Sequence, residues 1–294
     1  MFLLTGTEIM AFVKLVVFLV QVVIVKMAGV RIVWTVHNIN DHEDRHAVPH
    51  RIGMVCIARM ANAIVAHSEW AKNELTKMAR IANSVKIFVV PHGNFIGLYG
   101  NSISRTAARQ ELGIDDSRLV FLFLGKIRRY KGVLELVEAF NKFGRSDCEL
   151  LIAGAPFDSL LEAEIKAKLK SRKNIRFYSG VVPDDKVQVY MNACDVAVFP
   201  FRRITTSASV VLAMSFGRAC IAPRLGGLPE IVNEKGAILY DAGDGSGLER
   251  CLNEAFIHRP ELDAMGTSNL RRAEHWGWDR IGKMTMDIYT SICK

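Results

Sequence analysis

The chain has 294 residues, of which 50% are hydrophobic and 23% charged. It is long enough to bury one or two hydrophobic cores and too apolar to be disordered, so it should be globular. The formal net charge of +8 favours an anionic partner, either a phosphorylated ligand or an acidic lipid surface. Nucleic acid is disfavoured as a partner, because the basic residues are spread along the whole chain without a basic tail or an aromatic-basic motif.

The cysteines are scattered singly, with no C-x-x-C pair. They lack the density of a secreted disulfide scaffold, which indicates the reducing cytoplasm as the compartment.

One long apolar run, from Ile9 to Val25, is interrupted by Lys14 and Gln21. It is shorter than the ~20 uncharged residues that a membrane-spanning helix needs. We interpret it as a helix packed in an α/β core with Lys14 reaching solvent, and a helix lying on a membrane surface is the alternative. No basic stretch precedes the run and no small-x-small site follows it, which argues against a signal peptide.

Short apolar, β-branched runs alternate with helical patterns, as is typical of a parallel sheet covered by helices on both faces. The predicted strands are residues 31–36, 63–67, 86–90, 119–125, 148–154, 175–180, 196–200, 219–223 and 237–240. Residues 91–114 are rich in Gly, Ser and Asn and read as a linker, so we place a domain boundary near residue 105.

The domain after this boundary has enough strands for a complete doubly wound sheet, whereas residues 1–104 show only three. Such a small parallel sheet has little core and two exposed edges. We therefore expect either that an N-terminal portion is absent from this chain or that a partner covers the edge.

The first chemical motif is the segment LFLGKIRRYKGVLELVEAF, in which a strand ends at Gly125 and a helix follows. Between them lie Lys126, Arg128 and Lys131. Ligands of open α/β sheets bind at this carboxyl edge, and a glycine turn beside cations suits a departing diphosphate. A solvated basic loop is the plainer alternative.

The second motif runs from Phe199 to Val232. After a strand it carries several hydroxyls before a helix, namely Thr205, Thr206, Ser207 and Ser209, and after the next strand it carries Gly226 and Gly227. Unpaired N–H groups and the dipole at a helix start attract anions. An ordinary N-cap would need only one hydroxyl.

These motifs, in this order and with SGVVPDDKVQVYMNACDVAVFP between them, resemble the C-terminal domain of the family 4 (group 1) retaining glycosyltransferases. The resemblance covers about residues 31–290 and is strongest from Phe121 to Val232. It implies a GT-B fold of two doubly wound domains, a partial acceptor-side domain (1–104) and a donor-binding domain (105–275), with the donor between them. In that fold the last helix, here residues 276–294 with Trp276 and Trp278, crosses back to the first domain. The implied reaction moves a sugar from a nucleotide diphosphate with retention, without a metal and without a cofactor beyond the donor.

The resemblance also implies roles for single residues. Lys126 stands where the family usually has the Arg of its first diphosphate-binding turn, and Lys131 matches the second cation. His37, in TVHN, stands where the family has a histidine close to the donor sugar. The implied catalytic residues are His37, Lys126 and Lys131, and the implied donor-binding residues are Gly125, Arg128, Thr206, Ser207, Ser209, Gly227 and Glu230.

Two departures from the family stand out. Where it carries two Glu, one for the transferred sugar and one for the ribose, this chain has Ile204 and Leu212, which accept no hydrogen bond. Thr206, Ser207 and Ser209 would have to take over that recognition, or activity has been lost. In addition, nothing before Arg31 resembles the family's opening strand and Gly-rich turn.

A histidine cluster raises the question of a metal site. His42, His46 and His50 are spaced four apart and would share a helical face, close to His37. Pro49 and the acidic neighbours argue instead for a polar loop lining the acceptor cleft. We expect no bound metal.

The function we expect is transfer of a hexose from a UDP- or GDP-sugar to a glycan or lipid-linked glycan in polysaccharide biosynthesis. The enzyme would be cytoplasmic or peripheral on the inner face of the plasma membrane. One alternative is a non-catalytic or truncated nucleotide-sugar-binding subunit that needs a partner. A nucleotide-sugar epimerase is a second alternative, although the converging acidic and histidine residues of that class are not evident.

Overall fold

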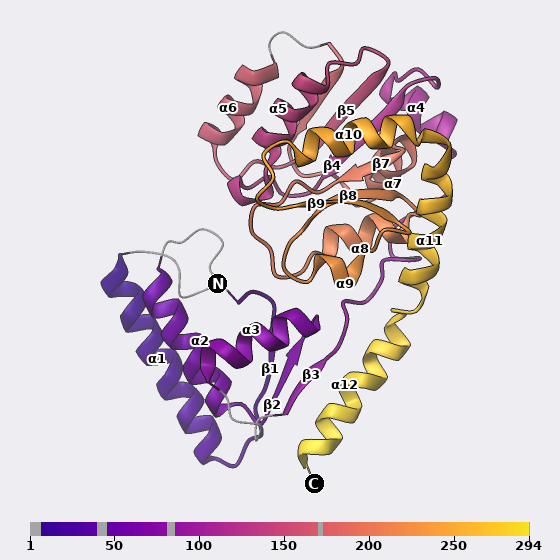
Figure 1. The fold of residues 1–294 in the computed structure, drawn as a ribbon. Coiled ribbons are helices and arrows are strands. Elements are labelled where there is room, and N and C mark those ends of the chain that lie inside the picture. Colours follow the sequence, from indigo (N-terminus) through magenta and orange to yellow (C-terminus); the bar gives the residue numbers. More distant parts are fainter. Residues whose placement is uncertain (1–6, 40–45, 81–85, 170–172, 294) are drawn as a thin grey trace. The chain divides into compact units, whose positions relative to one another are not determined.

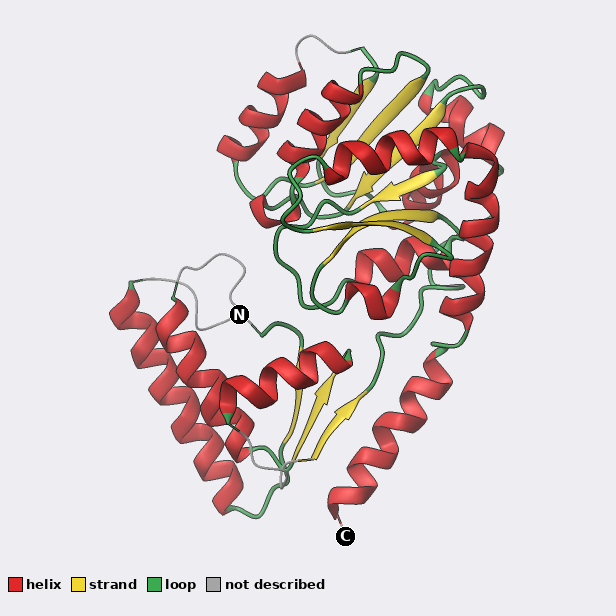
Figure 2. Cartoon of the chain, viewed as in Figure 1, coloured by secondary structure: helices red, strands yellow, loops and turns green. Residues whose placement is uncertain are grey.

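The computed structural model describes residues 7–39, 46–80, 86–169 and 173–293 of the chain, which folds into two compact units. The first unit comprises Met1–His92, Ile204–Thr206 and Trp278–Lys294, and the second comprises Gly93–Arg203 and Ser207–Gly277. Figures 1 and 2 show the α/β composition of both, with helices flanking parallel strands. Every strand predicted from the sequence is present, with bounds that differ by one or two residues at most.

The change of unit comes at His92 rather than at the expected residue 104. The linker bonds directly into the second unit, because the Asn94 backbone N–H donates to the Trp276 carbonyl at 2.9 Å and the Asn94 side chain donates to the Ala273 carbonyl at 2.9 Å. The Phe95 N–H donates to the Ser215 hydroxyl at 3.0 Å. Glycine and asparagine therefore mark an ordered connection here and not a flexible one.

Within the described residues, the sheet of the first unit has the order β1–β2–β3, and all its pairs are parallel. Its strands are β1 (Val33–Val36), β2 (Ala63–Ala66) and β3 (Lys86–Val89), and the helices of this unit are α1 (Glu8–Met27), α2 (Ala47–Met60), α3 (Glu69–Ala79) and α12 (Trp278–Cys293).

Strand β2 is buried on both faces, as a central parallel strand should be. Its residues alternate between two hydrophobic clusters. Ala63 and Val65 pack with Ile281 and Ile288 of α12, and Ile64 and Ala66 pack in the cluster that includes α2 and α3. The last helix thus covers one face of this sheet, as the family resemblance implied for residues 276–294.

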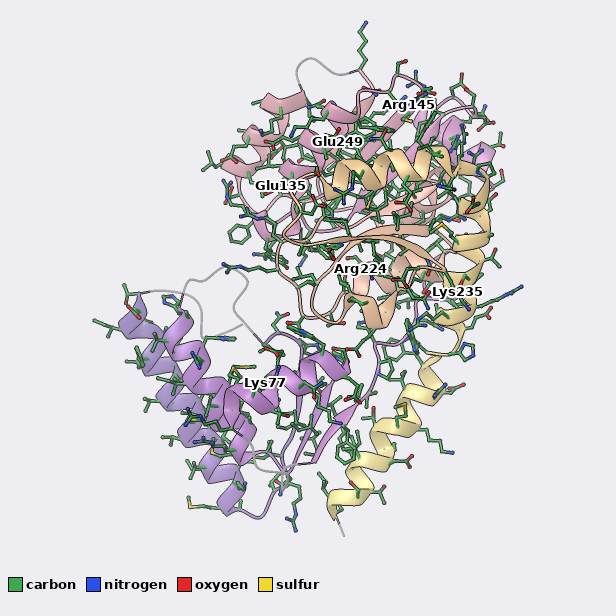
Figure 3. The ribbon with its side chains drawn as sticks, viewed as in Figure 1. Lys77, Glu135, Arg145, Arg224, Lys235 and Glu249 are labelled. Atoms are coloured by element: carbon green, nitrogen blue, oxygen red, sulfur yellow. The ribbon has the colours of Figure 1, made fainter. Side chains whose placement is uncertain are left out.

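Helix α1 is not the core helix that its sequence suggested. Only Ala11 and Leu15 are buried, and most of its other apolar side chains, drawn as sticks in Figure 3, are exposed. A helix that is apolar on all sides needs neighbours on all sides to be buried, and α1 packs mainly on α2. There Leu15 Cδ1 lies 2.9 Å from the position of a Cβ on Gly53, so that glycine permits the close approach of the two helices.

Helix α2 corrects a second expectation. The stretch around Pro49, which was expected to be a loop, is helical from Ala47 onward. Proline is tolerated in the first turn of a helix, because the N–H that it lacks would have no partner there. His50 therefore lies on a helix and His46 at its N-cap position.

The sheet of the second unit, among the residues described, has the order β6–β5–β4–β7–β8–β9 with every pair parallel. Its strands are β4 (Leu119–Leu124), β5 (Cys148–Gly154), β6 (Ile175–Ser179), β7 (Val196–Val198), β8 (Ala219–Arg224) and β9 (Ala237–Asp241). Its helices are α4 (Arg105–Leu112), α5 (Val133–Phe143), α6 (Ser159–Leu169), α7 (Asp184–Ala193), α8 (Ala208–Ser215), α9 (Leu228–Ile231), α10 (Gly247–Ile257) and α11 (Leu262–Glu274), and short 3₁₀ turns are η2 (Arg129–Lys131) and η3 (Arg259–Glu261).

The central strands β4 and β5 are buried along their whole length, which explains their continuous apolar sequences. The chain runs from β4 outward through β5 and β6 on one side, and then returns to β7 and runs outward through β8 and β9 on the other. This is the doubly wound arrangement, and it reverses direction between β4 and β7.

A buried arginine holds that reversal point from the amino ends of the strands. The Arg109 side chain, on α4, is 0% exposed and pairs with the Asp195 carboxylate at 2.8 Å. It also donates to the carbonyls of Ala193, Asp116 and Arg118 at 2.9–3.0 Å. The same carboxylate accepts from the Val120 N–H of β4 at 2.8 Å. The charge of Arg109 is therefore compensated, and its nitrogens and the carboxylate of Asp195 are hydrogen-bonded.

Replacing Arg109 by Ala should destabilise the second unit by about 3–5 kcal/mol, because the Asp195 carboxylate would lose its buried cation and several backbone carbonyls would lose their donor. The matched control is Arg105→Ala, since Arg105 pairs with the same carboxylate at 2.9 Å but is 41% exposed. That variant should cost less than about 1 kcal/mol. Denaturant dependence of amide hydrogen exchange in β4 measures both, and equal losses in the two variants would contradict this account.

Candidate functional site

The candidate site lies at the carboxyl edge of the second sheet, where the strand order reverses between β4 and β7. Crossovers leave in opposite directions there, and open α/β sheets bind their ligands at such a reversal. The turn after β4 begins at Gly125, and the segment after β7 leads into α8. Both chemical motifs of the sequence therefore meet at this edge.

Gly125, which has no side chain, lies close to both the Lys131 ammonium group and the Ser209 hydroxyl. Its φ of +135° is one that residues with side chains rarely adopt. A Cβ built there would lie 3.5 Å from Ser209 Oγ and 3.6 Å from Lys131 Nζ. The absence of a side chain thus leaves backbone, hydroxyl and ammonium groups around one small volume, which suits an anionic oxygen.

Lys131 is the cation that the fold turns inward. It ends the turn η2 and is half-buried. Burial, together with the nearby charges of Arg128 and Lys126, lowers its pKa to about 8. A bound anion would raise the pKa of Lys131 again, because its negative charge stabilises the half-buried ammonium group and offsets the repulsion from Arg128 and Lys126.

The other cations of this turn differ from Lys131. Arg129 forms a two-pronged ion pair with Glu164 at 2.7 and 2.9 Å, which raises its pKa and directs it away from the edge. The Arg128 guanidinium lies 4.2 Å from the centroid of the Phe157 ring. Lys126 is exposed. Phe157, which supports Arg128, carried no signal in the sequence.

The hydroxyls before α8 divide between two roles. Ser207 is the N-cap, and its Oγ accepts from the Val210 N–H at 3.3 Å. Its role is thus the ordinary structural one. Ser209 lies in the first turn of α8 and faces Gly125. Of the two, Ser209 has the better position for a ligand.

Gly227 and Glu230 lie beyond the carboxyl end of β8. Gly227 is the N-cap of the short helix α9, and its carbonyl accepts from the Glu230 N–H at 3.1 Å. The Glu230 side chain is exposed, and its carbonyl accepts from Arg272 at 2.7 Å. The structure thus places both residues one strand beyond β7 on the edge that carries Gly125.

His37 and Thr206 belong to the first unit. His37 directly follows β1 and is exposed. In the segment Ile204–Thr206, the Thr205 hydroxyl accepts from the Ile39 N–H at 3.3 Å, whereas the Thr206 hydroxyl is buried without a hydrogen-bond partner in the described part of the chain.

Sequence reasoning missed His67 and His92, which lie in a row with His37. The ring centroids of His37 and His67 are 5.3 Å apart, and those of His67 and His92 are 6.0 Å apart. Each histidine lies at the end of a predicted strand or just after it, so the signal was their common place at the carboxyl ends of parallel strands. Among residues 7–39, 46–80, 86–169 and 173–293, no group of three His, Cys, Asp or Glu has metal-binding geometry, and His42 lies outside those ranges.

Another hollow in the second unit is unsuited to phosphate. It has a volume of about 350 Å³ and is lined by several carboxylates, including Glu135 on α5 and Glu249 on α10, which Figure 3 labels. Its lining also includes Lys142 and Arg202, but its four carboxylates outnumber these two cations, so it attracts an anion less than the edge at Gly125 does.

The decisive comparison concerns the unit that carries this edge. Residues 118–256 match the family model described as Glycosyl transferases group 1. The part of the chain that carries this edge is thus similar to the group 1 glycosyltransferases. The match begins just before β4 and ends in α10, so it includes Gly125, Lys131, Ser209 and Glu230.

Curated relatives extend this similarity beyond the matched residues. The chain is 27% identical over 79% of its length to alpha-maltose-1-phosphate synthase from Mycobacterium tuberculosis, and 28% identical over 82% to D-inositol 3-phosphate glycosyltransferase from Streptomyces avermitilis. It spans 64% of the first relative and 54% of the second, which is less than two thirds of either.

Solved structures show the GT-B fold. HepE from Anabaena, in complex with UDP and glucose, matches with a TM-score of 0.81 and 18% identity over 96% of this chain and 76% of that one. Sucrose-phosphate synthase from Thermosynechococcus elongatus matches with a TM-score of 0.76 and 18% identity over 88% and 67%. The expected fold class is therefore confirmed.

Binding of inorganic diphosphate should weaken as the pH rises through about 8, because Lys131 loses its charge there. Lys131→Arg stays protonated across this range and should not show the fall. Binding near pH 8 should also take up a proton, since the anion raises the pKa of Lys131. Calorimetry in two buffers of different ionisation enthalpy measures this uptake. An identical pH dependence of binding in the unmodified chain and in Lys131→Arg would contradict the role of Lys131 in anion binding.

Proposed function

We propose that the protein is a retaining glycosyltransferase that moves a hexose from a UDP- or GDP-sugar to a glycan or lipid-linked glycan. The observation that carries this proposal is the approach of Lys131 Nζ and Ser209 Oγ to Gly125 at the edge where the sheet reverses. The similarity to the group 1 glycosyltransferases supports it, as does the neighbour with UDP and glucose.

In the reaction, the bond between the anomeric carbon and the diphosphate oxygen breaks, and its electron pair leaves with the nucleoside diphosphate. An acceptor hydroxyl forms the new bond to that carbon, on the same face, and passes its proton to an oxygen of the departing diphosphate. Lys131 acts on the negative charge that grows on the departing diphosphate, and Ser209 donates a hydrogen bond to it. Because Lys131, Arg128 and Lys126 gather in one turn, we propose that the departure needs no metal ion.

The first unit would serve the acceptor and the transferred sugar. His37 stands exposed at the carboxyl end of β1, the edge at which α/β units bind their ligands. We assign it to the sugar, as the sequence resemblance implied, and we place the enzyme in polysaccharide biosynthesis in the cytoplasm.

A second candidate is a nucleotide-sugar-binding subunit without transferase activity. Ile204 and Leu212 favour it, because two carboxylates expected to bind the sugar and the ribose are replaced by side chains without polar atoms. The two candidates differ in one measurement, since both bind a nucleotide sugar but only the enzyme releases nucleoside diphosphate with a new glycoside.

Lys131→Ala should lower donor-dependent turnover by ~10²-fold or more, the scale for loss of one contact to a transition-state charge. The matched control is Arg129→Ala, which removes a neighbouring cation that is paired with Glu164 and should leave turnover within about threefold. Nucleoside diphosphate release from UDP- and GDP-sugars is the assay. Equal turnover in both variants would remove Lys131 from the mechanism, and calorimetric binding without turnover in the unmodified chain would favour the binding subunit.

We further propose that α1 rests on a membrane surface. By length and composition this helix is one that could cross a membrane, and 17% of its most apolar stretch is buried. Exposed valines such as Val16 and Val20 lie along it. Arg31 and Arg51, also exposed, add positive charge near its end and on α2. Apolar area beside basic residues is typical of a helix lying in an anionic interface.

Val20→Glu should weaken binding to vesicles of phosphatidylcholine and phosphatidylglycerol by about tenfold or more, since a buried valine contributes ~1.5 kcal/mol. Val181→Glu is the control, because that side chain is 83% exposed but belongs to the second unit. Cosedimentation measures both. Undiminished binding of Val20→Glu would refute the membrane role, as would a dimer in solution that this variant dissociates.

A further inference from the structure

The row of histidines in the first unit follows directly from its topology. His37 follows β1, His67 follows β2 and His92 lies three residues after β3, and the sheet order puts β2 in the middle. His67 is therefore the central ring, with neighbours at 5.3 and 6.0 Å between centroids. The ring of Trp278, on α12, lies edge-on to His92 at 6.3 Å.

The hydrogen bonding of His67 fixes its tautomer. Its Nδ1 lies 2.9 Å from the Val90 carbonyl oxygen, which can only accept, so Nδ1 carries the proton. In the neutral ring Nε2 is then a bare acceptor. This nitrogen is buried and has no hydrogen-bond partner among the residues that the structure describes. Buried polar atoms are rarely left in this state, so a donor is expected for it.

Of the two imidazole rings beside His67, that of His37 is the nearer, and it can supply this donor. It is exposed and can rotate about its side-chain torsions, and its centroid distance of 5.3 Å from His67 is close to that of two imidazoles joined by one N–H···N bond. His92 is more distant, at 6.0 Å.

We propose that His67 is a positioning residue for His37: its bare Nε2 accepts a hydrogen bond from a ring N–H of His37, which turns the other, unprotonated nitrogen of His37 outward to accept a hydrogen bond from a sugar hydroxyl. The chain of bonds runs from the Val90 carbonyl through two imidazoles to the substrate. This deepens the proposed function, on which the sugar's role rests, but the bond between the two histidines does not depend on it.

The environment of His67 keeps this acceptor available. Burial lowers the pKa of His67, the bond to the Val90 carbonyl raises it, and the charges of His37 and His92 lower it. The net direction is downward, so His67 stays neutral to a lower pH than an ordinary histidine. Once it is protonated, Nε2 becomes a donor, and His37 loses its fixed orientation.

Two variants of the full chain separate the acceptor from the packing. His67→Phe keeps a ring of similar size and removes the acceptor, whereas His67→Gln places an amide oxygen near the position of Nε2. We expect His67→Phe to lower kcat by about tenfold or more with little change in KM for the donor, and His67→Gln to restore most of it. In a His37→Ala background, His67→Phe should have no further effect.

Imidazole ¹⁵N spectra provide a readout that does not need activity. In the unmodified chain, His37 should show one tautomer, and it should show a mixture in His67→Phe. In the pH profile of kcat, the acid limb due to His67 should disappear in His67→Gln, which does not titrate. Thermal unfolding and diphosphate binding to the second unit confirm that each variant is folded.

These experiments test the hydrogen bond between His67 and His37 whether or not the chain is a glycosyltransferase. If the chain proves to be a binding subunit, the ¹⁵N spectra still test the bond between the histidines. An unchanged His37 spectrum in folded His67→Phe would overturn the proposal. So would equal activities of the Phe and Gln variants, or additive effects of His67→Phe and His37→Ala.

Discussion

The parallel pairing of β4 with β7 is the constraint on which the candidate site depends. It joins two halves that run outward in opposite directions, and it brings the turn at Gly125 and the start of α8 to the same edge. At the other end of these strands, Asp195 binds both Arg109 and the N–H of Val120, so the pairing is anchored by a buried charge. The candidate site and the buried ion pair therefore lie at opposite ends of the same two paired strands.

Lys131 is a half-buried charge that an anionic ligand would compensate. The fold places an ammonium group in a half-buried position beside two other cations, which is unfavourable for the protein alone. The repulsion among Lys131, Arg128 and Lys126 is located beside Gly125, where the ligand would lie. Such costs are typical of functional positions, since the rest of the domain supplies the stability that maintains them.

Much of the architecture could be predicted from the sequence because parallel strands, buried on both faces, require uninterrupted apolar runs such as 119–124 and 148–154. The motif order also located Gly125, Lys131 and Ser209. The predictions that were wrong concern segments whose structure depends on their tertiary surroundings. The same apolar pattern fits a buried and an exposed helix, so α1 was misjudged, and Pro49 ends a helix or begins one according to its position in the first turn. The pairing of Arg129 with Glu164, the cap made by Ser207 and the row of histidines arise from residues far apart in sequence, which no local pattern specifies.

The first unit is discontinuous in the chain, and this matters during synthesis. Ile281 and Ile288 of α12, which cover Ala63 and Val65 of β2, are synthesised after all of the second unit. Until then one face of this small sheet has no cover from α12, whereas the second unit, which is complete at Gly277, can already fold. The nascent chain would thus mature in reverse order, with the later domain formed first and the earlier one waiting for its closing helix, a stage at which chaperones that bind exposed apolar strands would have their longest opportunity.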